Sequence, residues 1–414
     1  MSVIYPFTAL RPAPKAAAAV ASVPYDVVNT EEARGLAEGN PLSFLRVSRP
    51  EIELPPGTDC HADAVYDLAA RNFARLKDLA PLVVEQEASF YVYRLHMGGH
   101  VQSGVAACFS IDEYDRDLIK KHEKTRPDKE DDRTRHMLAI GAQTGPVFLT
   151  YRASRAVDAA VAAAATGEPL YDIVAPDAVR HTVWRVPSAI NQSLIDAFAA
   201  IDSLYIADGH HRAASAARTR SALQQKSASS VSSAALKSSS SAARVEYESV
   251  LAVAFPDNQM QVLPYNRVVR DLHGLTANEF LGSLRRRLTV TEGGPATPAR
   301  KGEVGMYLAG AWHTLTLPAS THSLDVDTLE TTILEAVLGI DDVRTDKRID
   351  FVGGIRGTSA LEQLVNNASF AVAFSMFPVS VEDLMRVSDA GGIMPPKSTW
   401  FEPKLRDGLL SHLL

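Results

Sequence analysis

The pentapeptide Asp208-Gly-His-His-Arg212 places a carboxylate, two imidazoles and a guanidinium in one short stretch. The apolar residues 203–208 predict a strand, and the alanine-rich sequence that follows predicts a helix. A strand, a glycine turn and a helix start in that order direct backbone N–H groups to one point, which favours anion binding. Arg212 would hold a phosphate with its forked guanidinium, and a histidine would bind or polarise the transferring group. The alternative is structural, with Asp208 as a helix cap and the histidines in solvent.

A second group of reactive side chains lies in the charged run over residues 120–136. Pro127 suits the first turn of a helix there, and Thr125 can cap that helix. Glu123, which follows His122 beside a basic cluster, is a candidate general base. The alternative is a solvated, charged helix without chemistry.

The C-terminal sequence Met394-Pro-Pro-Lys-Ser-Thr-Trp-Phe-Glu-Pro-Lys404 joins hydroxyl groups and lysines to aromatic rings. Two prolines fix an extended backbone before Lys397, Ser398 and Thr399. These three side chains suit a phosphate or a carboxylate, so we expect the tail to return to the site together with Trp400. The alternative is a terminal strand in which Trp400 anchors a core.

Four familiar motifs are excluded by their spacing. The zinc motif HExxH needs a histidine where the chain has Arg126, and no GxSxG elbow occurs. Residues 392–398 have Pro396 where a phosphate loop needs glycine, and proline lacks an N–H donor. Gly353-Gly-Ile-Arg-Gly357 lacks the register of a dinucleotide-binding loop.

Composition sets the class of molecule that holds these residues. The chain has 414 residues, 46% of them hydrophobic and 22% charged, which excludes a wholly disordered protein and predicts two or three domains. Its net charge of −7 argues against nucleic acid or an anionic membrane as the main partner. Only Cys60 and Cys108 are present, no basic and apolar leader begins the chain, and no apolar run approaches about 20 residues, so we expect a cytoplasmic protein.

Hydrophobic periodicity alternates between helical and extended patterns, which predicts an α+β fold. A hairpin is expected over residues 89–111, with its turn at 97–100. The runs 247–255 and 261–269 are expected to be strands of one sheet. The serine-rich segment 219–244 has few large apolar groups, so we expect a mobile excursion or a frayed helix extension.

Seven strings spread along the chain resemble those of family 1015 of the bacterial and archaeal domains of unknown function. They are Tyr5-Pro-Phe-Thr-Ala-Leu-Arg-Pro12, Val23-Pro-Tyr-Asp-Val27, Ile119-Lys-Lys-His-Glu-Lys-Thr-Arg126, Tyr205-Ile-Ala-Asp-Gly-His-His-Arg212, Leu263-Pro-Tyr-Asn-Arg-Val-Val269, Ile349-Asp-Phe-Val-Gly-Gly-Ile355 and Met394-Pro-Pro-Lys-Ser-Thr-Trp-Phe-Glu-Pro-Lys404. The pair His-Glu-x-Thr and Asp-Gly-His-His-Arg also resembles the free serine kinases of the ParB/sulfiredoxin superfamily.

The resemblance implies a ParB/sulfiredoxin-like core over residues 112–275, with the low-complexity insert 219–244. It leaves α/β additions over residues 1–111 and 276–414, the second of which carries the tail that returns to the site. These additions depart from the kinase pattern and leave the phosphoryl donor and the acceptor open.

The kinase resemblance implies phosphoryl transfer from a nucleotide such as ATP or ADP, or from pyrophosphate, to the hydroxyl of free L-serine. It implies Mg²⁺, with Asp208 as the acid that orients serine or the metal, and it allows the reverse reaction on phosphoserine. The candidate catalytic residues are Glu123, Asp208 and His210. The candidate phosphate- or substrate-binding residues are His122, Thr125, Arg126, Gly209, His211, Arg212, Lys397, Ser398, Thr399 and Trp400.

Two other classes of function stay open on the sequence. One is a nucleotide-binding switch module of the ParB type without kinase chemistry, although the acidic chain has no helix-turn-helix pattern. The other is a metal-dependent phosphohydrolase that uses Asp208, His210 and His211, because carboxylate and imidazole suit several divalent ions.

Overall fold

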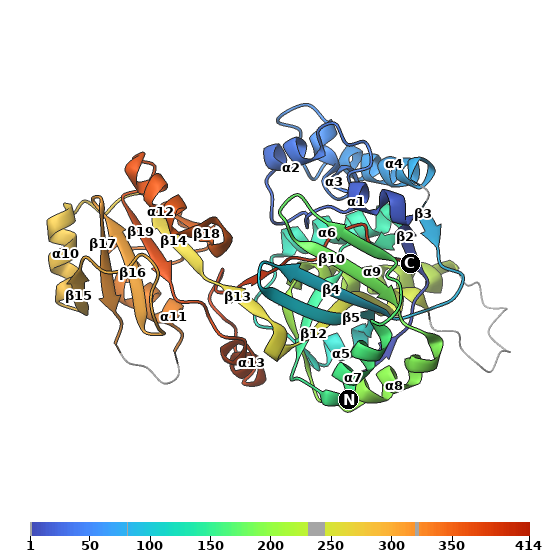
Figure 1. The fold of residues 1–414 in the computed structure, drawn as a ribbon. Helices are drawn as coiled ribbons and strands as arrows, with labels where there is room; N and C mark the ends of the chain where they lie inside the picture. The colour runs from blue at the N-terminus through green and yellow to red at the C-terminus, as the bar shows by residue number, and fades with distance from the viewer. Residues whose placement is uncertain (1, 81, 231–244, 319–322) are drawn as a thin grey trace. The chain divides into compact units, whose positions relative to one another are not determined.

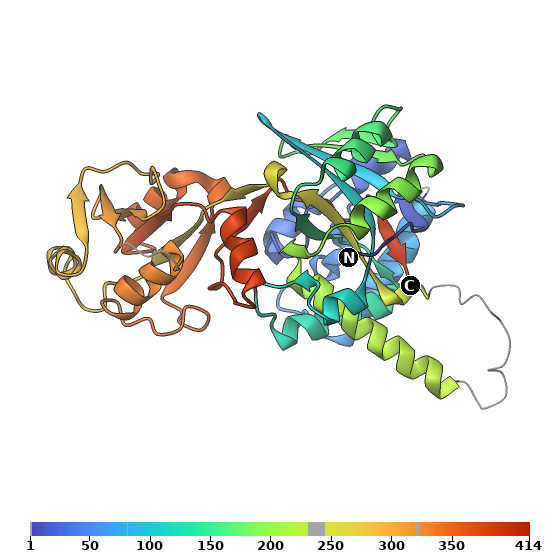
Figure 2. The ribbon, with the colours of Figure 1, turned by 90° about the horizontal axis from the view of Figure 1, so that it is seen from below.

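The structure is a computed structural model, and it describes residues 2–80, 82–230, 245–318 and 323–414. The chain divides into two compact units, here called unit 1 (Met1–Met260 with Pro403–Leu414) and unit 2 (Gln261–Glu402). The chain therefore leaves unit 1 and returns to it at the end, and both termini lie in unit 1 (Figures 1 and 2). Helices and strands mix in both units, so the predicted α+β class is confirmed.

Unit 1 is built on a large sheet, for which the described residues give nine strands in the order β6-β11-β8-β12-β5-β4-β10-β9, with β1 paired to β5. The strands are β1 Ile4–Tyr5, β4 Tyr91–Met97, β5 His100–Ser110, β6 Ile119–Lys120, β8 Val147–Tyr151, β9 Tyr171–Val174, β10 Arg180–Arg185, β11 Leu204–Asp208 and β12 Ser249–Pro256. Strand β12 is buried along its whole length and is apolar after Ser249, as expected of a strand covered on both faces.

The helices of unit 1 bring the two sequence motifs together. They are α1 Ala17–Val20, α2 Thr30–Ala37, α3 Leu45–Ser48, α4 Asp63–Leu79, α5 Ile111–Asp115, α6 Pro127–Ile140, α7 Arg155–Ala164, α8 Ser188–Ala199 and α9 His210–Ser230. Helices α7, α8 and α9 share one apolar core with the sheet, where Phe198, Ile206 and Ala216 are buried together. Helix α6 packs on both α9 and α4, so the charged run of the sequence lies beside the helix that follows Asp208.

A second, four-stranded sheet of unit 1 holds the end of the chain. Its order is β3-β2-β21-β7, with β2 Ala9–Pro12, β3 Leu82–Val84, β7 Ala142–Gln143 and β21 Ser411–Leu413. Strand β21 pairs antiparallel with both β2 and β7, and Phe44 and Phe73 belong to the core beneath this sheet. The last residues are thus fixed inside unit 1, which places the preceding residues 403–410 within reach of the candidate site.

Unit 2 has a sheet whose described strands run in the order β15-β17-β16-β19-β14-β18, and a separate pair, β13-β20. The strands are β13 Gln261–Leu263, β14 Tyr265–Val269, β15 Thr289–Glu292, β16 Glu303–Leu308, β17 Ala311–Thr316, β18 Ile349–Gly353, β19 Val372–Met376 and β20 Trp400–Glu402. The helices are α10 Ala277–Arg285, α11 Asp325–Leu329, α12 Gly357–Asn366 and α13 Val381–Asp389, and α11 runs on as a π-helix over Glu330–Glu335. A core of Val268, Val352, Leu361 and Phe370 joins one face of this sheet to α12.

One of two expectations about strand pairing needs correction. The hairpin is confirmed, with Met97 opposite His100, but the strands at 247–255 and 261–269 do not share a sheet. Pro264 interrupts the second run, so β13 pairs with β20 and β14 joins the sheet of unit 2.

The division into two units differs from the three regions 1–111, 112–275 and 276–414, because strands of the first two regions lie in one sheet.

The serine-rich segment begins as ordinary helix. Residues 219–230 continue α9, Thr219 is buried, and Arg220 forms an ion pair with Asp112 at 2.6 Å. The rest of the segment, residues 231–244, lies outside the described residues. Across the described residues, no helix combines the length and apolar character needed to cross a membrane.

Candidate active site

The turn between β11 and α9 places the Asp208 motif as the sequence predicts. The apolar strand ends at Asp208, Gly209 has φ +93°, and α9 begins at His210. A Cβ on Gly209 would lie 2.9 Å from Arg212 Nε, so only glycine lets the Arg212 side chain fold back against the turn. Strand, turn and helix start therefore converge on Asp208.

Asp208 is held by two cations that come from distant parts of the chain. Arg212 Nη2 donates to Asp208 Oδ2 at 2.6 Å, and Lys404 Nζ donates to Oδ1 at 3.2 Å. Burial alone would raise the pKa of Asp208, but Lys404 and Arg212 outweigh burial and hold that pKa below its usual range. Asp208 is therefore a carboxylate at neutral pH, and it orients both cations.

Arg212 is only 4% exposed and lies among acids. Its Nη1 donates to the Pro146 carbonyl, and its Nη2 lies 3.8 Å from Asp26 Oδ2. Burial opposes the charge, yet Asp26 and Asp208 raise the pKa of Arg212 above its ordinary value. The Nε atom of Arg212 is buried and has no hydrogen-bond partner among the described residues, so the guanidinium keeps an unused donor.

A pair of buried histidines lies beside this network. His122 Nε2 and His210 Nε2 are 3.4 Å apart, and the rings meet edge to face with centroids 4.4 Å apart. Burial lowers the pKa of His122 to about 4. Burial, and then His122, lower the pKa of His210 well below its ordinary value. Both rings are neutral at pH 7, so one can donate a hydrogen bond to the other.

The two predicted motifs also touch through their exposed residues. The backbone N–H of Arg126 donates to His211 Nε2 at 3.1 Å, while the Arg126 side chain forms an exposed ion pair with Asp128 at 2.8 Å. Glu123 is half-buried in the loop between β6 and α6. His122, Arg126, His210 and His211 are thus brought together, and Glu123 is next to His122 in the chain.

Thr125 does not cap α6 as expected. The residue before α6 is Arg126, without a side-chain cap, and the Thr125 hydroxyl donates instead to the Glu130 carboxylate. Pro127 is the first residue of the helix, as predicted. A phosphate-binding role for Thr125 stays a prediction.

The tail residues Lys397, Ser398, Thr399 and Trp400 belong to unit 2. Ser398 is buried and its hydroxyl donates to the Pro395 carbonyl at 2.6 Å. Their part in a site with Asp208 stays a prediction. The lysine of the same string that contacts Asp208 is Lys404, which is not among the site residues expected from the sequence.

A further acid of this site, Asp407, comes from the end of the chain. Its backbone pairs with Ser22 through bonds of 2.9 and 3.2 Å, and it is 2% exposed. A Cβ on Gly145 would lie 2.8 Å from Asp407 Oδ1 and 3.4 Å from Arg212 Cδ, so the two side chains approach one another over this glycine. Burial raises the pKa of Asp407 to about 7, although Arg212 opposes the shift.

No sequence pattern indicates Asp407. Asp26 lies within the family string Val23-Pro-Tyr-Asp-Val27, so membership of that string could have indicated it as a site residue.

The site does not have the arrangement of a metal centre. Both oxygens of Asp208 contact cations, and His211 accepts from a backbone N–H. Within the described residues, no three His, Cys, Asp or Glu side chains gather as metal ligands. Asp208, His210 and His211 therefore do not fit a resident divalent ion in this arrangement.

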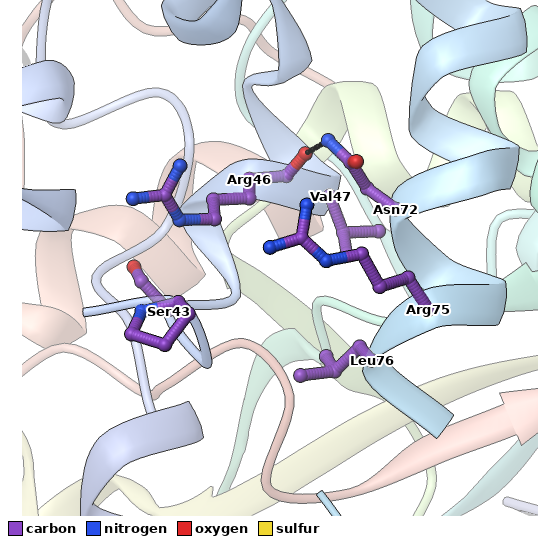
Figure 3. A pocket seen from close by; sticks show the side chains of 7 residues that line it. Ser43, Arg46, Val47, Asn72, Arg75 and Leu76 are labelled. Atoms are coloured by element: carbon purple, nitrogen blue, oxygen red, sulfur yellow. Dashed lines mark hydrogen bonds between the residues drawn. The ribbon is translucent and has the colours of Figure 1, made fainter. Parts of the chain in front are cut away.

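A surface hollow between α3 and α4 is separate from this site (Figure 3). It is lined by Pro41, Ser43, Arg46, Val47, Asn72, Arg75 and Leu76. Its volume of about 10 Å³ holds about one water molecule. Arg46 there is already paired with Glu53 at 2.5 Å.

The sequence matches the profile of one protein family over residues 4–333. The family is described as "Protein of unknown function (DUF1015)". This chain belongs to that family. The predicted membership is confirmed, and no curated protein matches the sequence.

Several solved structures resemble this member of the family at low identity. Free serine kinase in complex with AMP is 15% identical, with a TM-score of 0.36, over 73% of this chain and 92% of that one. A conserved hypothetical protein from Pyrococcus furiosus is 16% identical, with a TM-score of 0.36, over 74% and 95%. SbnI with a C-terminal truncation, from Staphylococcus aureus, is 12% identical, with a TM-score of 0.37, over 73% and 85%.

Proposed function

We propose that this protein is a small-molecule kinase whose Asp208 turn binds the transferred phosphoryl group. The acceptor is the hydroxyl of free L-serine, or the reaction runs in reverse on phosphoserine, in the cytoplasm. The observation that carries the proposal is the meeting of Arg212 and Lys404 at Asp208, where α9 begins. The same proposal includes a ParB/sulfiredoxin-like fold for the core that holds this turn.

The geometry supports phosphate binding in which Arg212 and Lys404 exchange part of their contact with Asp208 for contact with the phosphate. A phosphate that reaches the turn accepts from the unused Nε of Arg212 and from the ammonium of Lys404, and it takes over part of their charge from Asp208. The first N–H groups of α9 add partial positive charge at the same place. Asp208 keeps both cations in position before the ligand arrives.

Proton transfer falls to Glu123 and to the histidine pair. Glu123 takes the proton from the acceptor hydroxyl as a general base. The neutral pair of His122 and His210 offers one N–H without adding a charge that would have to be solvated. The donor is a nucleotide such as ATP or ADP, or pyrophosphate. Mg²⁺ comes with the phosphates of the donor, because the residues around Asp208 do not fit a resident ion.

Phosphorus NMR on the purified protein tests the reaction directly. The protein is incubated with serine or phosphoserine and, in turn, with ATP, ADP, CTP and pyrophosphate, each with Mg²⁺. A phosphoserine signal that appears or disappears with one donor supports the proposal. Nucleotide binding without any transfer would favour the switch module, and phosphate release without an acceptor would favour the hydrolase.

Arg212→Lys tests the phosphate site separately from the chemistry. Lysine keeps the charge but loses the fork and the Nε donor, so donor affinity should fall by about tenfold or more by calorimetry. Arg218→Lys is the matched control, since Arg218 lies on the same helix and pairs with Glu130 at the surface. Equal donor affinity in wild type and Arg212→Lys would place the phosphate elsewhere.

A further inference from the structure

Two of the strings that characterise the sequence, and the third up to residue 402, take no part in the candidate active site and meet inside unit 2. They contribute residues 263–269, 349–355 and 394–402. Strands β14, β18 and β20 and the turn before β20 are built from them.

Strand pairing creates a place for the Trp400 ring. In the antiparallel pair β14 and β18, Tyr265 is opposite Gly353 and Arg267 is opposite Phe351. A Cβ on Gly353 would lie 2.8 Å from the indole of Trp400, so the missing side chain makes room for that ring. Trp400 meets Tyr265 edge to face, with centroids 5.1 Å apart. Tyr265, Phe351 and Trp400 are each half-buried.

A buried positive charge lies among these rings. Arg267 is 2% exposed and donates to the Tyr265 carbonyl and, at 3.2 Å, to the Lys397 carbonyl. In the described part of the chain, no carboxylate oxygen lies within 4 Å of its guanidinium. Buried charges in proteins are nearly always paired, so this charge lacks its expected counter-ion. Glu330 acts on it only from a greater distance, and burial raises the pKa of Glu330.

A second cation is fixed beside the first by the backbone. Lys397 has φ +57°, a conformation that costs free energy for a residue with a Cβ. The Ser398 hydroxyl bond to Pro395 and the Arg267 bond to the Lys397 carbonyl hold this turn. Lys397 Nζ lies 5.4 Å from the centroid of the Tyr265 ring. Two cations and three half-buried aromatic residues thus share one end of the sheet, where the Trp400 indole N–H donates to the Glu402 carboxylate at 2.7 Å.

We infer that this cluster of Arg267, Lys397, Tyr265, Phe351 and Trp400 binds a nucleotide. Lys397 contacts the phosphates, and Arg267 is a positioning residue that holds the Lys397 turn and adds a buried positive charge with no carboxylate in contact among the described residues. The base packs on the rings of the half-buried Tyr265 and Trp400, since aromatic rings stack on any nucleobase. Every residue involved lies in unit 2, so the inference does not depend on the function proposed for the Asp208 turn.

The chain offers its own reporter for this site. It has three tryptophans, so the full-length double variant Trp184→Phe, Trp312→Phe leaves Trp400 as the only indole. ATP and tripolyphosphate are titrated against it with fluorescence as the readout. ATP should change the Trp400 emission saturably and bind at least about tenfold more tightly than tripolyphosphate. Calorimetry on the protein with all three tryptophans repeats the measurement if the double variant melts early.

Substitutions at the cluster decide the outcome. Lys397→Ala should weaken the ATP response by about tenfold or more, and Lys397→Arg should restore most of it. Lys347→Ala, at an exposed lysine of unit 2, is the matched control. Arg212→Lys in unit 1 should leave the Trp400 response unchanged, which separates this site from the proposed kinase site. A silent Trp400, equal affinity for ATP and tripolyphosphate, or an unaltered response in Lys397→Ala would overturn the inference.

Discussion

The Asp208 site of unit 1 and the Arg267 cluster of unit 2 treat buried positive charge in opposite ways. In unit 1, Arg212 and Lys404 face three acids, Asp26, Asp208 and Asp407. In unit 2, Arg267 faces backbone carbonyls and aromatic rings, and burial lowers its pKa to about 10. The first site pairs both cations with carboxylates and holds an additional acid, whereas in the second Glu330 acts on Arg267 only from beyond contact distance.

This difference separates two physical roles for a cation. Paired buried cations must be released from their acids before they can bind a phosphate. Removal of one of those acids leaves a buried charge without a partner, which destabilises the fold. An unpaired buried cation lowers stability at neutral pH and offers its whole field to an anion. Substitutions in unit 1 should therefore change stability and chemistry, and those in unit 2 should change binding with little effect on stability.

The largest expected effect is on turnover in unit 1. Glu123→Gln removes the proposed general base, so the transfer rate should fall by about 10²–10⁴-fold, and nucleotide affinity should change little. The rate is measured by phosphorus NMR and the affinity by calorimetry. The Trp400 response in unit 2 is the internal control. Turnover close to that of wild type would remove Glu123 from this role.

The next largest effect is on stability, through the pairing of Asp208. Asp208→Asn leaves Arg212 and Lys404 buried without their shared carboxylate, and the free energy of unfolding should fall by about 3–5 kcal/mol. Urea unfolding followed by circular dichroism measures this change. Asp342→Asn is the control, because the Asp342 pair with Arg344 is at the surface, and it should change stability little. A similarly small effect of Asp208→Asn would mean that Arg212 and Lys404 do not depend on the Asp208 carboxylate as their counter-ion.

A pH dependence follows from the excess acid of unit 1. Burial raises the pKa of Asp407 from its ordinary value near 4 to about 7, so the folded protein favours the protonated form. Between these two pH values the folded state binds a proton that the unfolded state has lost. Stability should therefore fall as the pH rises through this range, by about 1.4 kcal/mol per pH unit, and level off above pH 7.

Asp407→Asn should remove this slope. Asparagine keeps the shape without the ionisation, so the variant should be more stable than wild type at pH 8 and close to it at pH 4. Chemical unfolding at a series of pH values compares the two proteins. Identical slopes would show that Asp407 does not carry the excess proton.

The features of unit 1 that depend on neighbouring residues in the chain could be predicted from the sequence. The strand, glycine and helix around Asp208 follow from period and turn chemistry, and Pro127 marks the start of α6 correctly. Sequence reasoning could not find Asp407, because a single acid in a tail carries no pattern and becomes special only through burial beside Arg212. It also missed that Pro264 moves β14 into another sheet, since periodicity indicates a strand but not its partner.

The same limit explains the tail. Composition marked the string that ends at Lys404 as chemically unusual, but only the fold divides it between units, with Lys397 and Trp400 in unit 2 and Lys404 in unit 1. A boundary between Glu402 and Pro403 leaves no trace in hydrophobic pattern, because it depends on contacts between residues that are far apart in sequence.

The smallest expected effect is on the stability of unit 2. Arg267→Met removes two bonds to carbonyls and also a buried charge whose lowered pKa means that its proton costs folding free energy at neutral pH. These changes oppose each other, so the free energy of unfolding should stay within about 1 kcal/mol of wild type, against several at Asp208. Urea unfolding measures the stability, and the Trp400 response to ATP is measured on the same variant. We expect the ATP response to weaken because the Lys397 turn loses its anchor. A loss of stability as large as that of Asp208→Asn would show that Arg267 is a structural cation like Arg212, and the contrast between the two units would fail.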